Sequence, residues 1–302
     1  MSVQRPPNPL DTVCQHLSIS HLMANGNQSD IHPSHVDTEL DGLYEFAKIV
    51  QPIIHQNPGR LRAAELLLDA VGLHLEFTGF PNLDRSRKPH IFVANSPGCA
   101  LVDAAIGTRL VARLGLPPII AGLADLVDGA DSGNFISMAH PPIQPSDPRR
   151  LPQIAAQNTK SMTRMRASLS SGEKGLMIFP GMGMHSRDPN DRFLAERSFD
   201  RLAPLLLATR ELQPNLHLFH IDYDLPGWWQ RLGKRNPAQF YLRQWKAVLS
   251  LRKQVISVRH LKSVTIHPDI SKQQRYALCR DWLNLCNQHS RECRGDSDHV
   301  AA

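Results

Sequence analysis

The segment HIFVANSPGCALVDAAIGTRLVARL, residues His90 to Leu114, carries the clearest fold signal in the chain. It begins with a short apolar run, from His90 to Asn95, that is typical of a buried strand. Ser96-Pro97-Gly98 follows as a turn, and the apolar residues from Leu101 to Leu114 recur at helical spacing. A strand, a tight turn and a helix in this order predict an α/β arrangement.

The same pattern recurs on both sides of this segment. Downstream we expect helices at 158–170, 198–209 and 271–287, and strands at 175–180, 216–221 and 264–267. Upstream we expect a pair of amphipathic helices at 37–56 and 60–71, then a strand at 73–77. The predicted fold is α/β: a mixed, mostly parallel sheet of about six to seven strands, flanked by helices, with an N-terminal amphipathic helix pair. The expected division is a flexible arm at 1–36, one domain at 37–290 and a disordered tail at 291–302.

Composition narrows the classes of protein that fit. The 302 residues are 41% hydrophobic and 21% charged, which excludes wholesale disorder. Lysine and arginine outnumber aspartate and glutamate by 34 to 28, and the net charge of +6 favours anionic partners. No apolar run reaches the roughly 20 residues that span a membrane, and the N-terminus lacks an apolar signal region. We therefore expect a cytoplasmic protein, or one held peripherally at the inner membrane.

The five cysteines indicate free thiols in a reducing compartment. Cys279, Cys286 and Cys293 are seven residues apart, which places them on one helical face. They form no CxxC pair, and no zinc-ligand spacing surrounds them. We therefore expect no metal site.

Two turns hold the candidate functional residues. The first runs from Asn95 to Asp103 and the second from Phe179 to Arg187. Each follows a predicted buried strand and precedes a predicted helix. Turns at the carboxyl ends of strands in open α/β sheets are where ligands bind, so these turns are the expected site.

The order of these units resembles the glycerolipid (lysophosphatidic acid) acyltransferase family over residues 60–285. A first strand, flanked by a glycine on each side, is followed by a second strand. The second strand ends just before the place of the family's His-x4-Asp motif. An "L-x-x-G" helix end then leads into the place of the family's Phe-Pro-Glu-Gly-Thr-Arg-Ser motif, and a His-Pro strand comes late. The residues concerned are Val71-Gly72-Leu73, Gly79-Phe80-Pro81-Asn82-Leu83, Ala94-Asn95, Leu169–Gly172, Ile178-Phe179-Pro180 and Ile266-His267-Pro268.

The resemblance implies an acyltransferase of lipid metabolism, in phospholipid biosynthesis. In that family a histidine acts as general base on an acceptor hydroxyl, and an aspartate orients its imidazole. The hydroxyl attacks an acyl thioester carried by coenzyme A or acyl carrier protein, and no further cofactor is needed. The glutamate-containing turn binds the acceptor's phosphate and glycerol.

This sequence departs from the family at the charged positions of the first motif. Ser96 stands at the histidine position, and a serine hydroxyl takes up no proton near neutral pH. The candidate aspartate is Asp103, with six intervening residues instead of four. This longer spacing predicts that Asp103 could not orient the imidazole of a histidine placed at position 96 by Ser96→His.

The second motif lacks its glutamate in either alignment. Without a gap, Gly181 takes the glutamate position. With a one-residue insertion, Met182 takes it, and His185 and Ser186 take the arginine and serine positions. The expected substrate-binding residues are Asn95, Gly181, Met182, Gly183, Ser186 and Arg187.

Two arrangements can replace the missing base. His185 can act from the neighbouring turn, with Arg187 and Asp188 beside it in the sequence. Alternatively, Ser96 or Cys99 can accept the acyl group covalently. The plain interpretations are Ser96 as a helix N-cap, Cys99 as a packing residue and His185 as a solvated loop residue.

Three function classes stay open at this point. The first is an enzyme moving an acyl chain from a thioester to a hydroxyl or amine acceptor, with Ser96, Asp103 and His185 as candidate catalytic residues. The second is a catalytically silent relative that binds lipid, acyl carrier protein or a partner enzyme. The third, an α/β hydrolase, is disfavoured because Gly-x-Ser-x-Gly is absent.

Three other segments carry histidine–aspartate or basic–aromatic patterns. His32–Asp37 has no strand before it, and His217–Asp222 lies within a predicted strand, so its two ends point to opposite faces. Residues 228–253 mix tryptophan, phenylalanine and tyrosine with lysine and arginine. They fit either an anionic membrane surface or a solvated helix. No nucleic-acid recognition pattern accompanies them, and we expect no nucleic-acid partner.

Overall fold

The computed structural model describes residues 45–53, 55–56, 60–83, 88–123, 135–138, 150–181, 193–226 and 244–294. The chain groups into two compact units, one of residues 1–74 and 224–254 and the other of residues 75–223 and 255–302. The predicted single domain at 37–290 and the arm at 1–36 stay predictions. The larger unit holds the two turns singled out by the sequence.

Among the described residues, seven strands form one mixed sheet in the order β1-β7-β6-β2-β5-β3-β4. The pairs β6–β2, β2–β5, β5–β3 and β3–β4 are parallel, and β7 is antiparallel to β6. The predicted mixed, mostly parallel sheet is therefore confirmed. The strands are β1 (His74–Thr78), β2 (His90–Ala94), β3 (Pro118–Leu123), β4 (Phe135–Met138), β5 (Gly175–Ile178), β6 (Asn215–Asp222) and β7 (Val255–Thr265).

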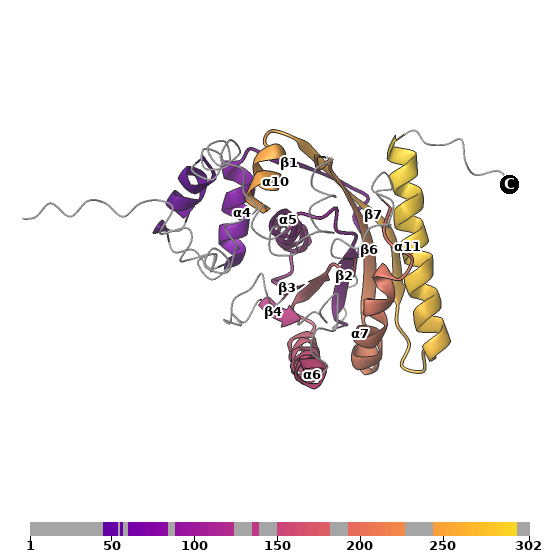
Figure 1. Cartoon of the computed structure of the whole chain (residues 1–302). Coiled ribbons are helices and arrows are strands. Elements are labelled where there is room, and N and C mark those ends of the chain that lie inside the picture. The colour runs from indigo at the N-terminus through magenta and orange to yellow at the C-terminus, as the bar shows by residue number, and fades with distance from the viewer. Residues whose placement is uncertain are drawn as a thin grey trace, which may run out of the picture. The chain divides into compact units, whose positions relative to one another are not determined.

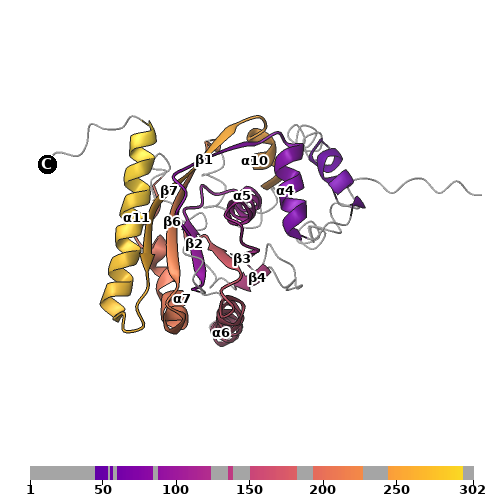
Figure 2. The ribbon, with the colours of Figure 1, turned by 180° about the vertical axis from the view of Figure 1, so that it is seen from behind.

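Helices flank the sheet, as predicted. Figure 1, and the reverse view in Figure 2, place α5 on one side of β2 and β6, with α7 and α11 on the other. The helices are α4 (Arg60–Ala70), α5 (Ala100–Arg113), α6 (Arg150–Leu169), α7 (Leu202–Thr209), α10 (Gln244–Ser250) and α11 (Lys272–Arg294). Two short 3-10 turns, η3 (Ser198–Arg201) and η4 (Arg210–Leu212), flank α7.

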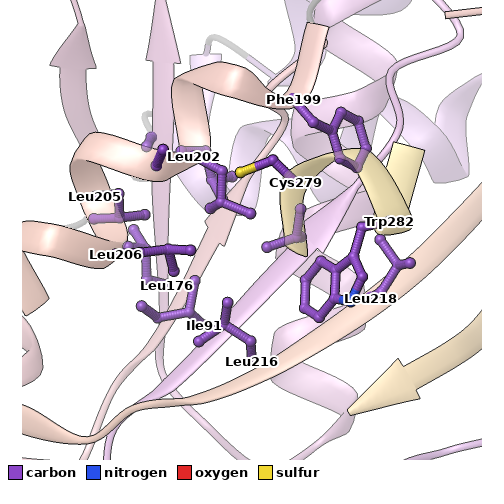
Figure 3. Close-up of a cluster of buried hydrophobic side chains, with 14 of the residues drawn as sticks. Ile91, Leu176, Phe199, Leu202, Leu205, Leu206, Leu216, Leu218, Cys279 and Trp282 are labelled. Carbon is purple, nitrogen blue, oxygen red and sulfur yellow. The ribbon is translucent and has the colours of Figure 1, made fainter. Parts of the chain in front are cut away.

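Strand β2 is buried along its whole length because it has neighbours on both edges and helices on both faces. Its odd-numbered residues Ile91 and Val93 join a core cluster with α6, α7 and α11. Figure 3 shows Trp282 of α11 beside Leu218 and Leu216 of β6 in this cluster. Burying a large apolar side chain of this kind contributes about 1.5–3 kcal/mol, so this layer fixes where β2 ends.

The opposite face of the sheet meets α5 closely. Gly107 of α5 lies against β5 so tightly that an added Cβ would come 2.7 Å from Met177 Cγ. Gly175, the first residue of β5, has a similar approach to Val111 of α5 and to Phe92 of β2. The two glycines therefore set the distance between the helix and the sheet.

The start of α5 depends on an unusual turn. Gly98 has a φ of +130°, a region that only glycine enters without strain. Cys99 then occupies the N-cap position with extended backbone, and the helix begins at Ala100. The helix ends at Arg113, one residue before the predicted end.

The smaller unit contains residues 45–53, which are helical, together with α4 and α10. Arg252 forms a 2.6 Å ion pair with Glu45, and the His74 amide donates to the Gln254 carbonyl at 3.1 Å. The predicted beginning of the first helix, at Asp37, lies outside the described residues. No helix in the described ranges is both long and apolar enough to cross a bilayer.

Several predicted boundaries differ from the structure, and helix α6 begins at Arg150 where the sequence predicted 158. Helix α11 continues to Arg294, so the expected tail starts four residues too early; i,i+4 contacts such as Gln288 to Glu292 extend the helix. Strand β7 spans Val255–Thr265, where the sequence predicted 264–267. Many of its residues are only partly buried, so the strand lacks a clear alternation of buried and exposed positions. Strands β3 and β4 were not predicted, although β3 lies within an apolar run of the sequence.

Candidate active site

A hydroxyl–carboxylate pair lies directly after β2, at the carboxyl end of the sheet's central strand. Ser96 Oγ donates to Asp103 Oδ2 at 2.5 Å, across seven residues of sequence. Ser96 is 3% exposed and Asp103 is 2% exposed. Asp103 therefore reaches position 96 despite the longer spacing, whereas the prediction that it could not orient a histidine placed there stays a prediction. The Gly98 turn takes up the extra residues, and the first turn of α5 carries Asp103 back over Ser96.

Tyr223, which is distant from Ser96 and Asp103 in the sequence, completes this group. Its hydroxyl donates to Asp103 Oδ1 at 2.6 Å, and it accepts a hydrogen bond from the Cys99 amide at 3.2 Å. The residue follows β6 immediately, next to β2 in the sheet. Sequence reasoning missed Tyr223, since nothing in its local pattern marks it; only the parallel pairing of β6 with β2 brings it to this edge.

The electrostatics of Asp103 follow from its burial. Removal from water raises the pKa of this carboxyl to about 7, although hydrogen bonds from Ser96, Tyr223 and the Gly98 backbone favour the ionised form. The pKa of Tyr223 is raised well above its ordinary value by burial and by the nearby Asp103. Near neutral pH the site therefore holds a carboxyl group that can either accept or donate a proton.

Cys99 is poorly suited to act as a nucleophile here. It is fully buried, and burial raises the pKa of its thiol far above the ordinary value. The reactive form of a cysteine is the thiolate, so the neutral thiol serves packing. The interpretation of Ser96 as the helix N-cap is also wrong, because Cys99 holds that position and the Ser96 hydroxyl goes to Asp103.

Asn95 ties the two central strands together. Its Nδ2 donates to the Ile221 carbonyl at 2.8 Å, and its Oδ1 accepts from the Ile221 amide at 2.7 Å. The predicted substrate-binding role of Asn95 stays a prediction, and its amide is committed to β6. This paired contact fixes the end of β2 relative to the end of β6, which carries Tyr223.

The second predicted turn starts at the same edge of the sheet. Val93 of β2 pairs with Ile178 of β5, so the turns after both strands leave from adjacent positions. Gly181 is buried, and an added Cβ would lie 3.1 Å from Leu194 Cδ2. The other candidates in this turn, Met182, Gly183, His185, Ser186 and Arg187, lie outside the described residues, as does Asp188.

The structure describes one of the two alternative His-x4-Asp strings. His32–Asp37 lies outside the described residues. His217 lies in β6, as predicted, and its ring contacts His90 and Ser263 rather than Asp222. His220 bonds Ser290 of α11 on the other face of the sheet.

The His217 contacts form a chain of histidines, buried at His90 and His217, that the sequence did not indicate. His90 Nδ1 lies 3.0 Å from His217 Nε2, and Ser263 Oγ lies 2.8 Å from both His217 Nδ1 and His260 Nε2. Burial, reinforced by His90 and His260, lowers the pKa of His217 to about 3. His217 is therefore held neutral near physiological pH, and the chain contributes to the packing between β2, β6 and β7.

Neither a metal centre nor a disulfide emerges from the part of the chain that the structure describes. No group of three or more His, Cys, Asp or Glu side chains there has the geometry to hold a metal ion. Cys99, Cys279, Cys286 and Cys293 are free thiols.

The positions of Ser96, Asp103 and Tyr223 fit general acid–base chemistry or chemistry with a serine nucleophile. Comparison with known protein-family models and with curated proteins found no match to this chain.

Proposed function

We propose that this protein is an acyltransferase-like enzyme, moving an acyl chain from an acyl-CoA or acyl carrier protein thioester to a hydroxyl or amine acceptor. The observation that carries the proposal is the 2.5 Å contact between Ser96 Oγ and Asp103 Oδ2 at the carboxyl end of β2. This is the edge of an α/β sheet where ligands bind. It is also where the resemblance to glycerolipid acyltransferases puts the base and its aspartate.

The chemistry can proceed through Ser96 as the acyl carrier. Asp103 takes the Ser96 proton while Oγ bonds to the thioester carbonyl carbon, and the C–S bond breaks to release the thiol, which takes up the proton. The acceptor hydroxyl then attacks the acyl-serine, Asp103 receives the acceptor's proton, and Ser96 Oγ recovers it as the ester bond to Ser96 breaks. A carboxyl pKa of about 7 suits both directions of proton transfer near neutral pH.

Tyr223 is the positioning residue in this scheme. Its hydroxyl holds the second oxygen of Asp103 at 2.6 Å, which leaves the first oxygen facing Ser96. Without that contact the carboxyl group could rotate away from Ser96. His185 is the rival base, and its variant distinguishes the two schemes.

Two finer expectations accompany the proposal. The first is the N-terminal amphipathic helix pair, of which α4 and helical residues 45–53 are the described portions. The second is peripheral attachment to the inner membrane through 228–253, of which 244–253 lie in the described part of the chain. Anionic lipid attracts lysine and arginine by about 1 kcal/mol each at the surface. Vesicle co-sedimentation that requires anionic lipid and reverses with salt tests the attachment.

A specific observation favours a second candidate, the catalytically silent relative that binds lipid, acyl carrier protein or a partner enzyme. Ser96, Asp103 and Tyr223 are all buried, and their hydrogen bonds close on one another. A fully satisfied buried network rigidifies a fold without any chemistry. Under this alternative the same residues serve stability only.

The experiment is thiol release from acyl-CoA and from acyl carrier protein by the full chain, with a glycerophosphate or amine acceptor. Ser96→Ala and Asp103→Asn should each reduce the rate by at least about 10²-fold, the low end for loss of a base or nucleophile. Ser161→Ala, which removes a buried serine from the middle of α6, is the matched control and should keep full activity.

The outcomes separate the schemes. A severe loss in His185→Ala with mild effects at Ser96 and Asp103 would assign the base to His185. Wild-type protein that releases no thiol from any thioester tested, while remaining folded, would reject the enzyme and leave the binding relative.

A further inference from the structure

A second site of different character lies at the other end of α5. A cavity of about 320 Å³ is lined by Phe80, Pro81, Asn82, Leu83, Arg113 and Leu114. Arg113 is ten residues along the helix from Asp103, which at 1.5 Å per residue is about 15 Å. The cavity is therefore distinct from the Ser96 site.

At the cavity, the guanidinium of Arg113 lies over two stacked aromatic rings, those of Phe77 and Phe80. Arg113 Cζ lies 5.0 Å from the ring centroid of Phe77 and 5.4 Å from that of Phe80. The two rings stack on each other with centroids 5.9 Å apart. A guanidinium that lies over ring faces keeps its N–H donors in its own plane, where they can bind a carboxylate or phosphate in a bidentate manner.

Packing alone does not explain several features of this group of Arg113, Phe77 and Phe80. Phe80 is 44% exposed, although a phenylalanine of this size normally gains by burial. Within the part of the chain that the structure describes, no carboxylate pairs with Arg113, and none lines the cavity. The helix macrodipole accounts for a basic residue in the last turn of α5. It does not account for the exposed ring or the cavity beside it.

We propose that this cavity binds a small amphiphilic anion, with its carboxylate or phosphate on Arg113 and Asn82 and its apolar body against Phe80, Leu83 and Leu114. The volume suits a ligand of roughly ten non-hydrogen atoms, since a water-sized group occupies about 30 Å³. Ligand cavities begin near this size. The proposal goes beyond the acyl-transfer function and does not depend on it.

The test uses calorimetric titration of the full chain with sodium octanoate, octyl phosphate, 1-octanol and inorganic phosphate. The first two carry both parts of the predicted ligand, and at least one should bind. Octanol lacks the charge and inorganic phosphate lacks the apolar body, so each should bind at least about tenfold more weakly. Equal affinity for octanol, binding of inorganic phosphate alone, or no binding by any probe would each overturn the proposal.

Variants localise the site. Arg113→Gln should weaken octanoate or octyl phosphate binding by at least about tenfold, the effect of losing hydrogen bonds to a charged group. Phe80→Ala should weaken it severalfold by removing the apolar wall. Arg197→Gln removes another exposed positive charge, away from the cavity, and should leave the affinity unchanged.

A last variant separates this site from the proposed active site. Ser96→Ala should bind octanoate as well as wild type does. Binding that is lost in Ser96→Ala but retained in Arg113→Gln would place the ligand at the β2 turn and contradict the proposal.

Discussion

Ser96 and Asp103 meet at 2.5 Å although they are seven positions apart in the sequence. The contact depends on Gly98, whose positive φ reverses the chain before α5 begins. It also depends on β2 being fixed by β5 and β6, because a shift of the strand end would move Ser96 away from the helix. A local turn and a long-range sheet register thus produce one short hydrogen bond.

The raised pKa of Asp103 predicts a pH-dependent stability. The folded state holds the proton up to about pH 7, whereas the free carboxyl loses it near 3.8. Between these values the folded state binds more protons than the unfolded state. The Asp103 contribution to the unfolding free energy therefore falls as the pH rises, by up to about 1.4 kcal/mol per pH unit.

Asp103→Asn isolates this contribution. The unfolding free energy of the variant, relative to wild type, should increase steadily from pH 4 to pH 7 in urea titrations. A difference between the two proteins that stays flat across this range would contradict the buried carboxyl described here.

The opposite pH dependence is predicted at His217. Its folded pKa of about 3 lies below the ordinary value of 6.5, so the unfolded state binds the extra proton between these values. The His217 contribution to stability is therefore full above about pH 6.5 and is lost as the pH falls toward 3.

His217→Gln keeps hydrogen-bonding capacity without titrating. The variant should lose less stability than wild type between pH 6.5 and pH 4.5, a change in slope of up to about 1.4 kcal/mol per pH unit. An unchanged slope in denaturant titrations would show that His217 is not held neutral by its surroundings.

Tyr223→Phe should act on both partners of its hydroxyl. The Cys99 amide loses the Tyr223 hydroxyl as an acceptor, and loss of a hydrogen bond typically costs about 0.5–1.5 kcal/mol. Asp103 loses a donor that favours its ionised form, so its pKa should rise further. Carbon NMR of the Asp103 carboxyl measures the midpoint directly. A midpoint equal to or below that of wild type would refute the assigned hydrogen bond.

Gly175→Ala tests the close approach of α5 to the sheet. The new Cβ would lie 2.6 Å from Val111 Cγ1 and 2.7 Å from Phe92 Cε2. A β-branched side chain and a buried ring cannot yield easily, so the variant should lose about 1–3 kcal/mol of stability. Thermal unfolding monitored by circular dichroism would detect the loss as a lower Tm. An unchanged Tm would mean that the helix is free to move outward.

The sequence predicted the parts of the site that depend on local pattern. The apolar run before Asn95, the turn at Gly98 and the periodicity from Leu101 gave the strand, turn and helix within one or two residues. The start of the turn after Phe179 was also predicted at this edge, because neighbouring parallel strands end at the same edge of a sheet.

What could not be predicted depends on register between distant segments. Tyr223 is 120 residues from Asp103, and only the pairing of Ala94 with Phe219 places it there. The contact between His90 and His217 is likewise set by cross-strand neighbours. Hydrophobic periodicity fixes which face a residue occupies, but it carries no information about its partner on the next strand.

The most direct test of the Ser96–Asp103 mechanism is intact-mass spectrometry of the protein after brief incubation with acyl-CoA or acyl carrier protein, without acceptor, followed by peptide mapping. The mechanism predicts a mass increase equal to the acyl group, located on the peptide that contains Ser96. Ser96→Ala should form no adduct, and Asp103→Asn should form it at least about 10²-fold more slowly. Acceptor-dependent turnover that proceeds without any adduct, and at the same rate in Ser96→Ala as in wild type, would contradict it.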